Sequence, residues 1–166
     1  DVNLAISVKL KKLLEQSGIT VIMTRSDDNG LYNESDTNKK ASDMKKRCSI
    51  INESNADAVV SIHQNSYVSG ESRGAQVFYY KQSAEGKKLA GIIQRHIVNE
   101  ADTTNKRVEK ADSTYYLLLH TNVPAVIVEC GFLSNPEEAG RLNSDSYQQK
   151  IARGIYNGLM EYLTNQ

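Results

Sequence analysis

Two residues that can bind a metal or transfer a proton stand directly after apolar segments of the sequence. His63 follows Val59-Val60-Ser61-Ile62, and Glu129 follows Val126-Ile127-Val128. A neutral imidazole binds zinc, which lowers the pKa of a bound water to roughly 7. A carboxylate nearby can take the proton of that water and return it to a leaving amine. The pair therefore points to metal-assisted hydrolysis, provided that both side chains lie at one edge of the fold.

Each of these residues also has a purely structural interpretation. A single His after a strand can be a hydrogen-bonded structural residue, and a single Glu can be a cap or an ion-pair partner. The other histidines fit a site less well. His96 lies in a helical pattern beside Arg95, and we expect it to be exposed. His120 follows three leucines and either faces the same edge as Glu129 or has a structural role.

Helical and strand patterns alternate along the chain. Helices are expected at about 4–14, 39–54, 83–97, from 135, and at 146–163, and strands at 19–24, 58–62, 74–80, 115–119 and 124–128. This alternation predicts one α/β domain over residues 1–166, with a mostly parallel twisted sheet flanked by helices on both faces. In such sheets ligands bind beyond the carboxyl ends of the strands, where His63 and Glu129 stand.

Composition limits the possible partners. Lys and Arg number 20 and so do Asp and Glu, so nothing draws the chain generally to nucleic acid or to anionic membrane. No apolar run reaches the length of about 18 residues that spans a bilayer, so we expect no membrane insertion. Cys48 and Cys130 form no motif and are expected to be small core residues. The chain opens at Asp1 inside a helical pattern without Met, which we interpret as processing or truncation.

Local strings around the two site residues resemble a known family. Residues 56–65 read ADAVVSIHQN and resemble its "AD…SIHAN" segment, while residues 124–135 read PAVIVECGFLSN and resemble its "PAVLVE.GFLSN" segment. Residues 24–25, 73–80 and 105–107 match further segments in the same order. On these strings the chain is identified as a member of the amidase-3 family, the zinc-dependent N-acetylmuramoyl-L-alanine amidases.

The resemblance implies a role for each matching residue. His63 would be a zinc ligand, Glu129 the catalytic carboxylate, and Asn65 a residue that touches substrate or supports the metal. Gly131 and Phe132 would shape the floor beside Glu129. The substrate would be the amide between N-acetylmuramic acid and L-alanine in peptidoglycan. The enzyme would then work outside the cytoplasm, in cell wall, in periplasm or secreted, and a regulatory protein partner is possible.

The sequence also departs from the family pattern. The family places one zinc ligand in a "DPGHGG" turn and another, a Glu, just ahead of a "KDxNL" stretch whose tail matches Asp1, Asn3 and Leu4. Those ligands and the first strand are therefore expected upstream of Asp1. Leu119 stands where many members carry a basic residue, and some members with such differences act in spore cortex formation. The alternative is a metal-free module that binds peptidoglycan or a partner and keeps the fold.

Overall fold

Polar side chains begin the helices at the points where loop composition gives way to helical periodicity. Asp1, Asn38, Ser83, Asn135 and Ser144 each accept a hydrogen bond from a backbone N–H in the first helical turn. The computed structural model describes residues 1–165. Its helices are α1 (Val2–Gln16), α2 (Lys39–Glu53), α3 (Ala84–Ala101), α4 (Tyr116–Leu119), α5 (Pro136–Leu142) and α6 (Asp145–Thr164).

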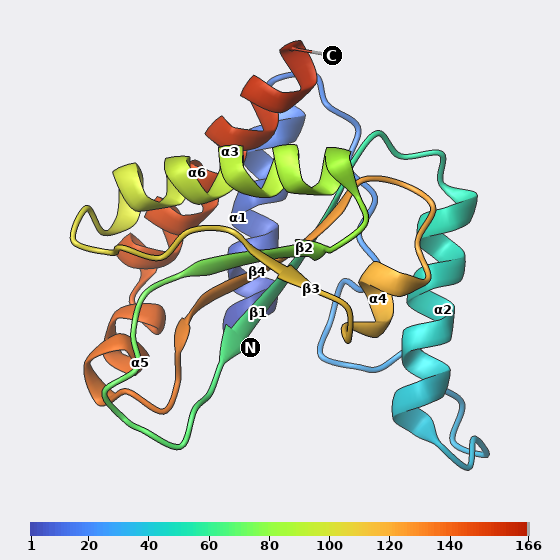
Figure 1. Ribbon diagram of the computed structural model, residues 1–166. Coiled ribbons are helices and arrows are strands. Elements are labelled where there is room, and N and C mark those ends of the chain that lie inside the picture. The colour runs from blue at the N-terminus through green and yellow to red at the C-terminus, as the bar shows by residue number, and fades with distance from the viewer. Residues whose placement is uncertain (166) are drawn as a thin grey trace.

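The strands form one open sheet. They are β1 (Val59–Asn65), β2 (Gln76–Tyr80), β3 (Lys110–Asp112) and β4 (Ala125–Phe132), in the order β1-β4-β2-β3. β1 pairs with β4 and β2 with β3 in parallel, while β2 and β4 are antiparallel. The predicted α/β class and mostly parallel sheet are confirmed (Figure 1).

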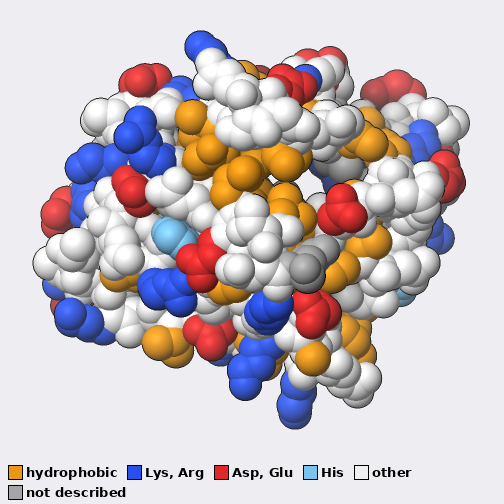
Figure 2. Space-filling model, turned by 90° about the horizontal axis from the view of Figure 1, so that it is seen from above, with side chains coloured by type: hydrophobic (Ala, Val, Ile, Leu, Met, Phe, Trp, Pro, Cys, Tyr) orange, Lys and Arg blue, Asp and Glu red, His pale blue; other side chains and the backbone are white. Residues whose placement is uncertain are grey.

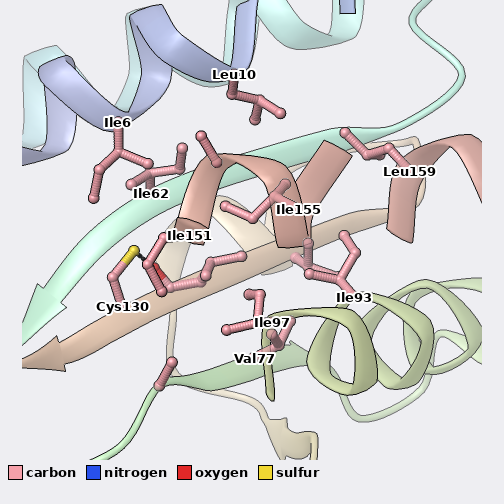
Figure 3. Close-up of a cluster of buried hydrophobic side chains, with 14 of the residues drawn as sticks. Ile6, Leu10, Ile62, Val77, Ile93, Ile97, Cys130, Ile151, Ile155 and Leu159 are labelled. Carbon is pink, nitrogen blue, oxygen red and sulfur yellow. Dashed lines mark hydrogen bonds between the residues drawn. The ribbon is translucent and has the colours of Figure 1, made fainter. Parts of the chain in front are cut away.

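The larger hydrophobic core lies between one face of the sheet and helices α1, α3 and α6. Ile6 and Leu10 of α1 meet Ile62 of β1, while Ile93 of α3 and Ile155 of α6 pack beneath them (Figure 3). α3 and α6 approach closely because α6 carries glycines at the contact. A Cβ on Gly158 would lie 2.8 Å from the Cα of Ile93.

Helices α2 and α4 cover the other face with a smaller core. Ile51 and Leu117 pack there against Phe78, Ala125 and Ile127. Helices thus flank both faces, as predicted.

The cysteines behave as predicted. Cys48 and Cys130 are both buried free thiols. In the described chain, residues 1–165, no helix is long and apolar enough to cross a membrane.

Three predictions of secondary structure were wrong. Residues 19–24 form no strand, although Ile19 and Val21 pack against the core and Ile22 is 57% exposed. A β-branched run becomes a strand only when a neighbouring backbone pairs with it.

Seen from above, hydrophobic side chains border a hollow in the surface (Figure 2).

Residues 115–119 form the short helix α4 and not a strand, and β3 lies in a stretch where no strand was expected. Leucine favours helix, and a segment of this length shows too little periodicity to decide. Within the helix expected at 4–14, Val8 is 52% exposed, because it lies two positions from buried Ile6 and hence on the far side of α1.

Candidate active site

His63 and Glu129 lie side by side on neighbouring strands. They are Cα partners in the parallel pairing of β1 with β4. In-register residues of adjacent strands point to the same face, and their strands lie about 4.8 Å apart. The two side chains therefore share one edge of the sheet, as metal-assisted hydrolysis by this pair requires.

The polar row continues onto a third strand. Gln76 of β2 is the antiparallel partner of Glu129. His63, Glu129 and Gln76 thus follow one another across the sheet on the face that α2 and α4 cover. The apolar cluster on that face takes in Val59, Ala125 and Ile127, in the amino-terminal parts of β1 and β4, and stops short of the row. The row therefore lies beyond the core, at the carboxyl ends of the parallel strands.

The carboxylate of Glu129 is held by one oxygen and left open at the other. Glu129 is 6% exposed, and the hydroxyl of Tyr115 donates a hydrogen bond of 3.0 Å to its Oε1. Its Oε2 is buried and has no protein partner within residues 1–165. Burial raises the pKa of Glu129, and the hydrogen bond from Tyr115 opposes that rise. Because Oε2 has no hydrogen-bond partner, it is free to accept a proton as a general base does.

The imidazole of His63 is exposed at the surface beside this carboxylate. Its Nε2 lies 2.9 Å from the Oγ of Ser61, two residues back on β1. Desolvation by the surrounding protein lowers the pKa of His63, and the positive charges of Arg47 and Arg25 lower it further. A lowered pKa favours the neutral ring, which is the form that binds a metal, and a hydroxyl on one ring nitrogen fixes the orientation of the other.

Asn65 lies where β1 ends, next to an exposed loop. Its Oδ1 accepts a hydrogen bond from the backbone of Ser66, and its carbonyl oxygen accepts one of 2.8 Å from the backbone of Leu133. Tyr67 and Leu133 are 62% and 47% exposed. The rim around His63 and Glu129 is thus open and partly apolar.

Phe132 lies beyond Glu129 on β4 and is the register partner of Asn65. Its backbone N–H donates to Oε2 of Glu138, whose Oε1 accepts from the backbone of Gly74. Glu138 is 4% exposed, so this carboxylate ties the end of β4 to the loop before β2. That Phe132 forms the floor beside Glu129 stays a prediction.

The other histidines lie elsewhere. His96 is half-buried and not exposed as expected, because its Nε2 lies 2.7 Å from Glu161 of α6. His120 is exposed at the end of α4, where its ring stacks on Tyr116. Asn52, near the end of α2, donates to the carbonyl oxygen of His120. His120 therefore belongs to the loop before β4, at the opposite end of that strand from Phe132, and has the structural role.

His63 and Glu129 have side-chain types that suit a metal site. A neutral imidazole beside an unpartnered buried carboxylate oxygen fits a zinc ligand and its base. A catalytic zinc site has several protein ligands plus a water. Within residues 1–165 no group of three or more His, Cys, Asp or Glu side chains is placed to hold a metal ion. The described residues thus hold no complete set of three ligands around His63.

Comparison with known proteins decides the family. The sequence profile of the N-acetylmuramoyl-L-alanine amidase family Amidase_3 matches residues 1–161. The chain belongs to this amidase family. It is 36% identical to the germination-specific N-acetylmuramoyl-L-alanine amidase of Bacillus subtilis (strain 168), over 100% of this chain and 71% of that protein.

Solved amidase structures share the fold. The CwlD amidase from Clostridioides difficile, solved in complex with the GerS lipoprotein, superposes with a TM-score of 0.97 at 43% identity, over 100% of this chain and 86% of that one. An N-acetylmuramoyl-L-alanine amidase from Clostridium difficile 630 gives a TM-score of 0.86 at 31% identity, over 100% of this chain and 84% of that one. This amidase is therefore a cell-wall hydrolase, as the resemblance implied.

Sequence reasoning missed two residues that lie beside Glu129. Tyr115 was assigned to a strand-like segment, and Gln76 to a strand without a role. A tyrosine just ahead of the segment leading to Glu129 carries no chemical signature of its own. The alternation of side chains along β2 is the sequence feature that could have placed Gln76 on the same face as Phe78.

Proposed function

We propose that this amidase is a zinc-dependent hydrolase that cleaves the amide between N-acetylmuramic acid and L-alanine in bacterial peptidoglycan. The observation that carries the proposal is the in-register pair of His63 and Glu129, with the Oε2 of Glu129 buried and unpartnered. His63 is proposed as a zinc ligand and Glu129 as the catalytic carboxylate. The family pattern implies further zinc ligands besides His63.

Zinc bound at this edge would supply a Lewis acid that polarises the amide carbonyl and acidifies water. The chain's own residues handle the protons. Oε2 of Glu129 accepts a proton from the attacking water, whose oxygen bonds to the carbonyl carbon of the lactyl group. As the carbon–nitrogen bond breaks, Glu129 gives the proton to the leaving nitrogen of L-alanine. The products are a free lactyl carboxylate on the sugar and a peptide with a free amino terminus.

Two residues are proposed to orient these steps. Tyr115 holds Oε1 of Glu129 by its 3.0 Å hydrogen bond, which leaves Oε2 as the basic oxygen. Asn65, two residues after His63 on β1, is proposed to contact substrate. Its Oδ1 is engaged by the backbone of Ser66, so its amide N–H groups are the ones available to a substrate carbonyl.

The test measures zinc content and peptide release together. The complete enzyme should contain zinc, and incubation with purified wall should release peptides whose new amino terminus is L-alanine. Glu129→Ala should keep the zinc and lose about 10²–10⁴-fold in rate. Zinc binding without any amide cleavage would overturn the proposal. Binding of peptidoglycan with no zinc present would support the alternative, a metal-free module that binds wall or a partner.

The site of action and a protein partner follow from the same relatives. Because the substrate is cell wall, we propose that the amidase works outside the cytoplasm. The similar CwlD amidase was solved in complex with a lipoprotein, and another relative is a germination-specific amidase. A regulatory protein and a role in spore wall remodelling are proposed on that basis. Activity on purified cortex compared with vegetative wall, with and without the lipoprotein, tests both.

A further inference from the structure

Arg107 stands apart from the other partly buried arginines of this chain. Arg25, Arg47 and Arg141 each form an ion pair with a carboxylate. Within residues 1–165 Arg107 forms none. Its guanidinium instead donates to two uncharged oxygens, the carbonyl of Arg73 at 2.7 Å and the side-chain Oε1 of Gln76 at 3.1 Å. A half-buried cation without a counter-charge invites an anionic ligand.

This cation adjoins the proposed active site. Its hydrogen-bond partner Gln76 is the cross-strand partner of Glu129. The guanidinium also lies 4.8 Å from the centroid of the Phe132 ring, and Phe132 is the register partner of Asn65. Gln76 and Phe132 therefore fix Arg107 at the end of the row that begins with His63.

The frame around Arg107 is rigid. The Nε2 of Gln76 donates to the carbonyl oxygen of Val108, so the glutamine is held at both ends of its amide. Stacking on Phe132 and the bond to Arg73 restrict the plane of the guanidinium. An arginine fixed in this way loses little entropy when its planar fork binds a carboxylate through two parallel hydrogen bonds.

We propose that Arg107 binds a free carboxylate of the stem peptide and thereby selects the peptide half of the substrate. The proposal rests on the proposed amidase function. The peptide is joined to the sugar through its amino end, so its carboxyl groups are free to reach Arg107. The strand spacing plus the glutamine side chain place the guanidinium roughly 10 Å from the carboxylate of Glu129. An extended residue spans about 3.5 Å, so the carboxylate belongs to the second or third residue after the cut.

The test compares substrates that differ in one charge. Muramoyl dipeptides and tripeptides are offered to the complete zinc-loaded enzyme with the terminal carboxylate free or converted to a carboxamide. The wild type should prefer one free acid by about 10- to 100-fold in kcat/KM, the scale of a charge-assisted hydrogen bond. Arg107→Gln should abolish this preference, because its kcat/KM for the free acid falls relative to that for the carboxamide. Arg107→Lys should keep part of the preference, since it retains charge but not the fork.

Lys106→Gln is the matched control. Lys106 is exposed, and its substitution removes one positive charge at the position directly before Arg107. It should leave the preference intact. Calorimetric binding of the free product peptide, as acid and as carboxamide, gives a second measure that needs no turnover. Equal cleavage of both substrates by the wild type would overturn the Arg107 proposal and leave the amidase function standing. Equal loss on both substrates in Arg107→Gln would show a structural role instead. Absence of cleavage of every muramoyl peptide would overturn the function itself.

Discussion

Replacing Tyr115 by Phe tests how the active carboxylate is oriented. The change removes only the hydroxyl that donates 3.0 Å to Oε1 of Glu129. The ring should stay in place, because it packs edge-on against Phe78 with centroids 5.6 Å apart. The fold therefore loses one hydrogen bond and no packing, and the consequence should appear in catalysis.

The size of the effect follows from the charge on the acceptor. A hydrogen bond to a charged group contributes about 1.5–3 kcal/mol, which corresponds to roughly 10- to 150-fold in rate. The hydroxyl stabilises only the ionised form of Glu129, so its removal disfavours that form. The pKa of Glu129, already raised by burial, should rise further. The acidic limb of the kcat/KM profile should then move to higher pH, because the base works only when ionised.

The assay is kcat and KM for a muramoyl peptide across pH, with a thermal melt of each protein. Tyr116→Phe is the control, since Tyr116 is 37% exposed and its ring stacks on His120, away from Glu129. Tyr115→Phe should lower kcat and shift the limb with KM nearly unchanged, while Tyr116→Phe should change neither. A rate within twofold of the wild type and an unmoved limb would refute the claim that Tyr115 orients the base.

Three further changes probe the same design. Glu129→Gln should lose activity yet raise the free energy of unfolding at neutral pH by about 1 kcal/mol, the lower end of the cost of an unsatisfied buried group. Burial raises the pKa of Glu129 above its ordinary value of 4.5. The ionised carboxylate therefore costs the fold nothing below pH 4.5, and this cost grows as the pH rises through the folded pKa. The free energies of unfolding of the wild type and of Glu129→Gln should therefore converge in acid. Gly158→Ala should lose about 1–3 kcal/mol, since its Cβ would lie 2.8 Å from the Cα of Ile93, whereas Gly140→Ala meets nothing within 4 Å and should be neutral or stabilising by denaturant titration. Glu138→Ala leaves two backbone N–H groups without an acceptor and should cost about 2–6 kcal/mol, with faster proteolysis of the loop before β2 as its local sign.

The parts of this molecule that sequence patterns predicted are those where one local rule dominates. The buried face of α1 can be predicted because its apolar residues Ile6, Leu10 and Leu14 recur every fourth residue. β4 is buried along its whole length and therefore appears as an apolar run. His63 and Glu129 stand out because a polar side chain after such a run interrupts the pattern. Their adjacency needed one further assumption, that β1 and β4 are neighbours.

The parts that sequence patterns did not predict depend on contacts between distant segments. Tyr115 is hydrogen-bonded to Glu129, which is 14 residues away in the sequence, and Arg107 is hydrogen-bonded to Gln76, which is 31 residues away. Residues 19–24 have strand propensity, but that propensity has no effect without a paired backbone. Tertiary context decides such cases, and a single sequence does not contain it.

The distribution of apolar contact over the two faces of the sheet accounts for where the site lies. α1, α3 and α6 bury one face in the larger core, which leaves little room there for polar chemistry. α2 and α4 cover only part of the other face, so Glu129 can be buried while His63 beside it stays exposed. A polymer too large to enter a closed cavity can be cleaved at such an edge, because the base is shielded from water and the neighbouring rim remains open. The same geometry makes Glu129 costly to the fold, so activity and stability at this position should move in opposite directions.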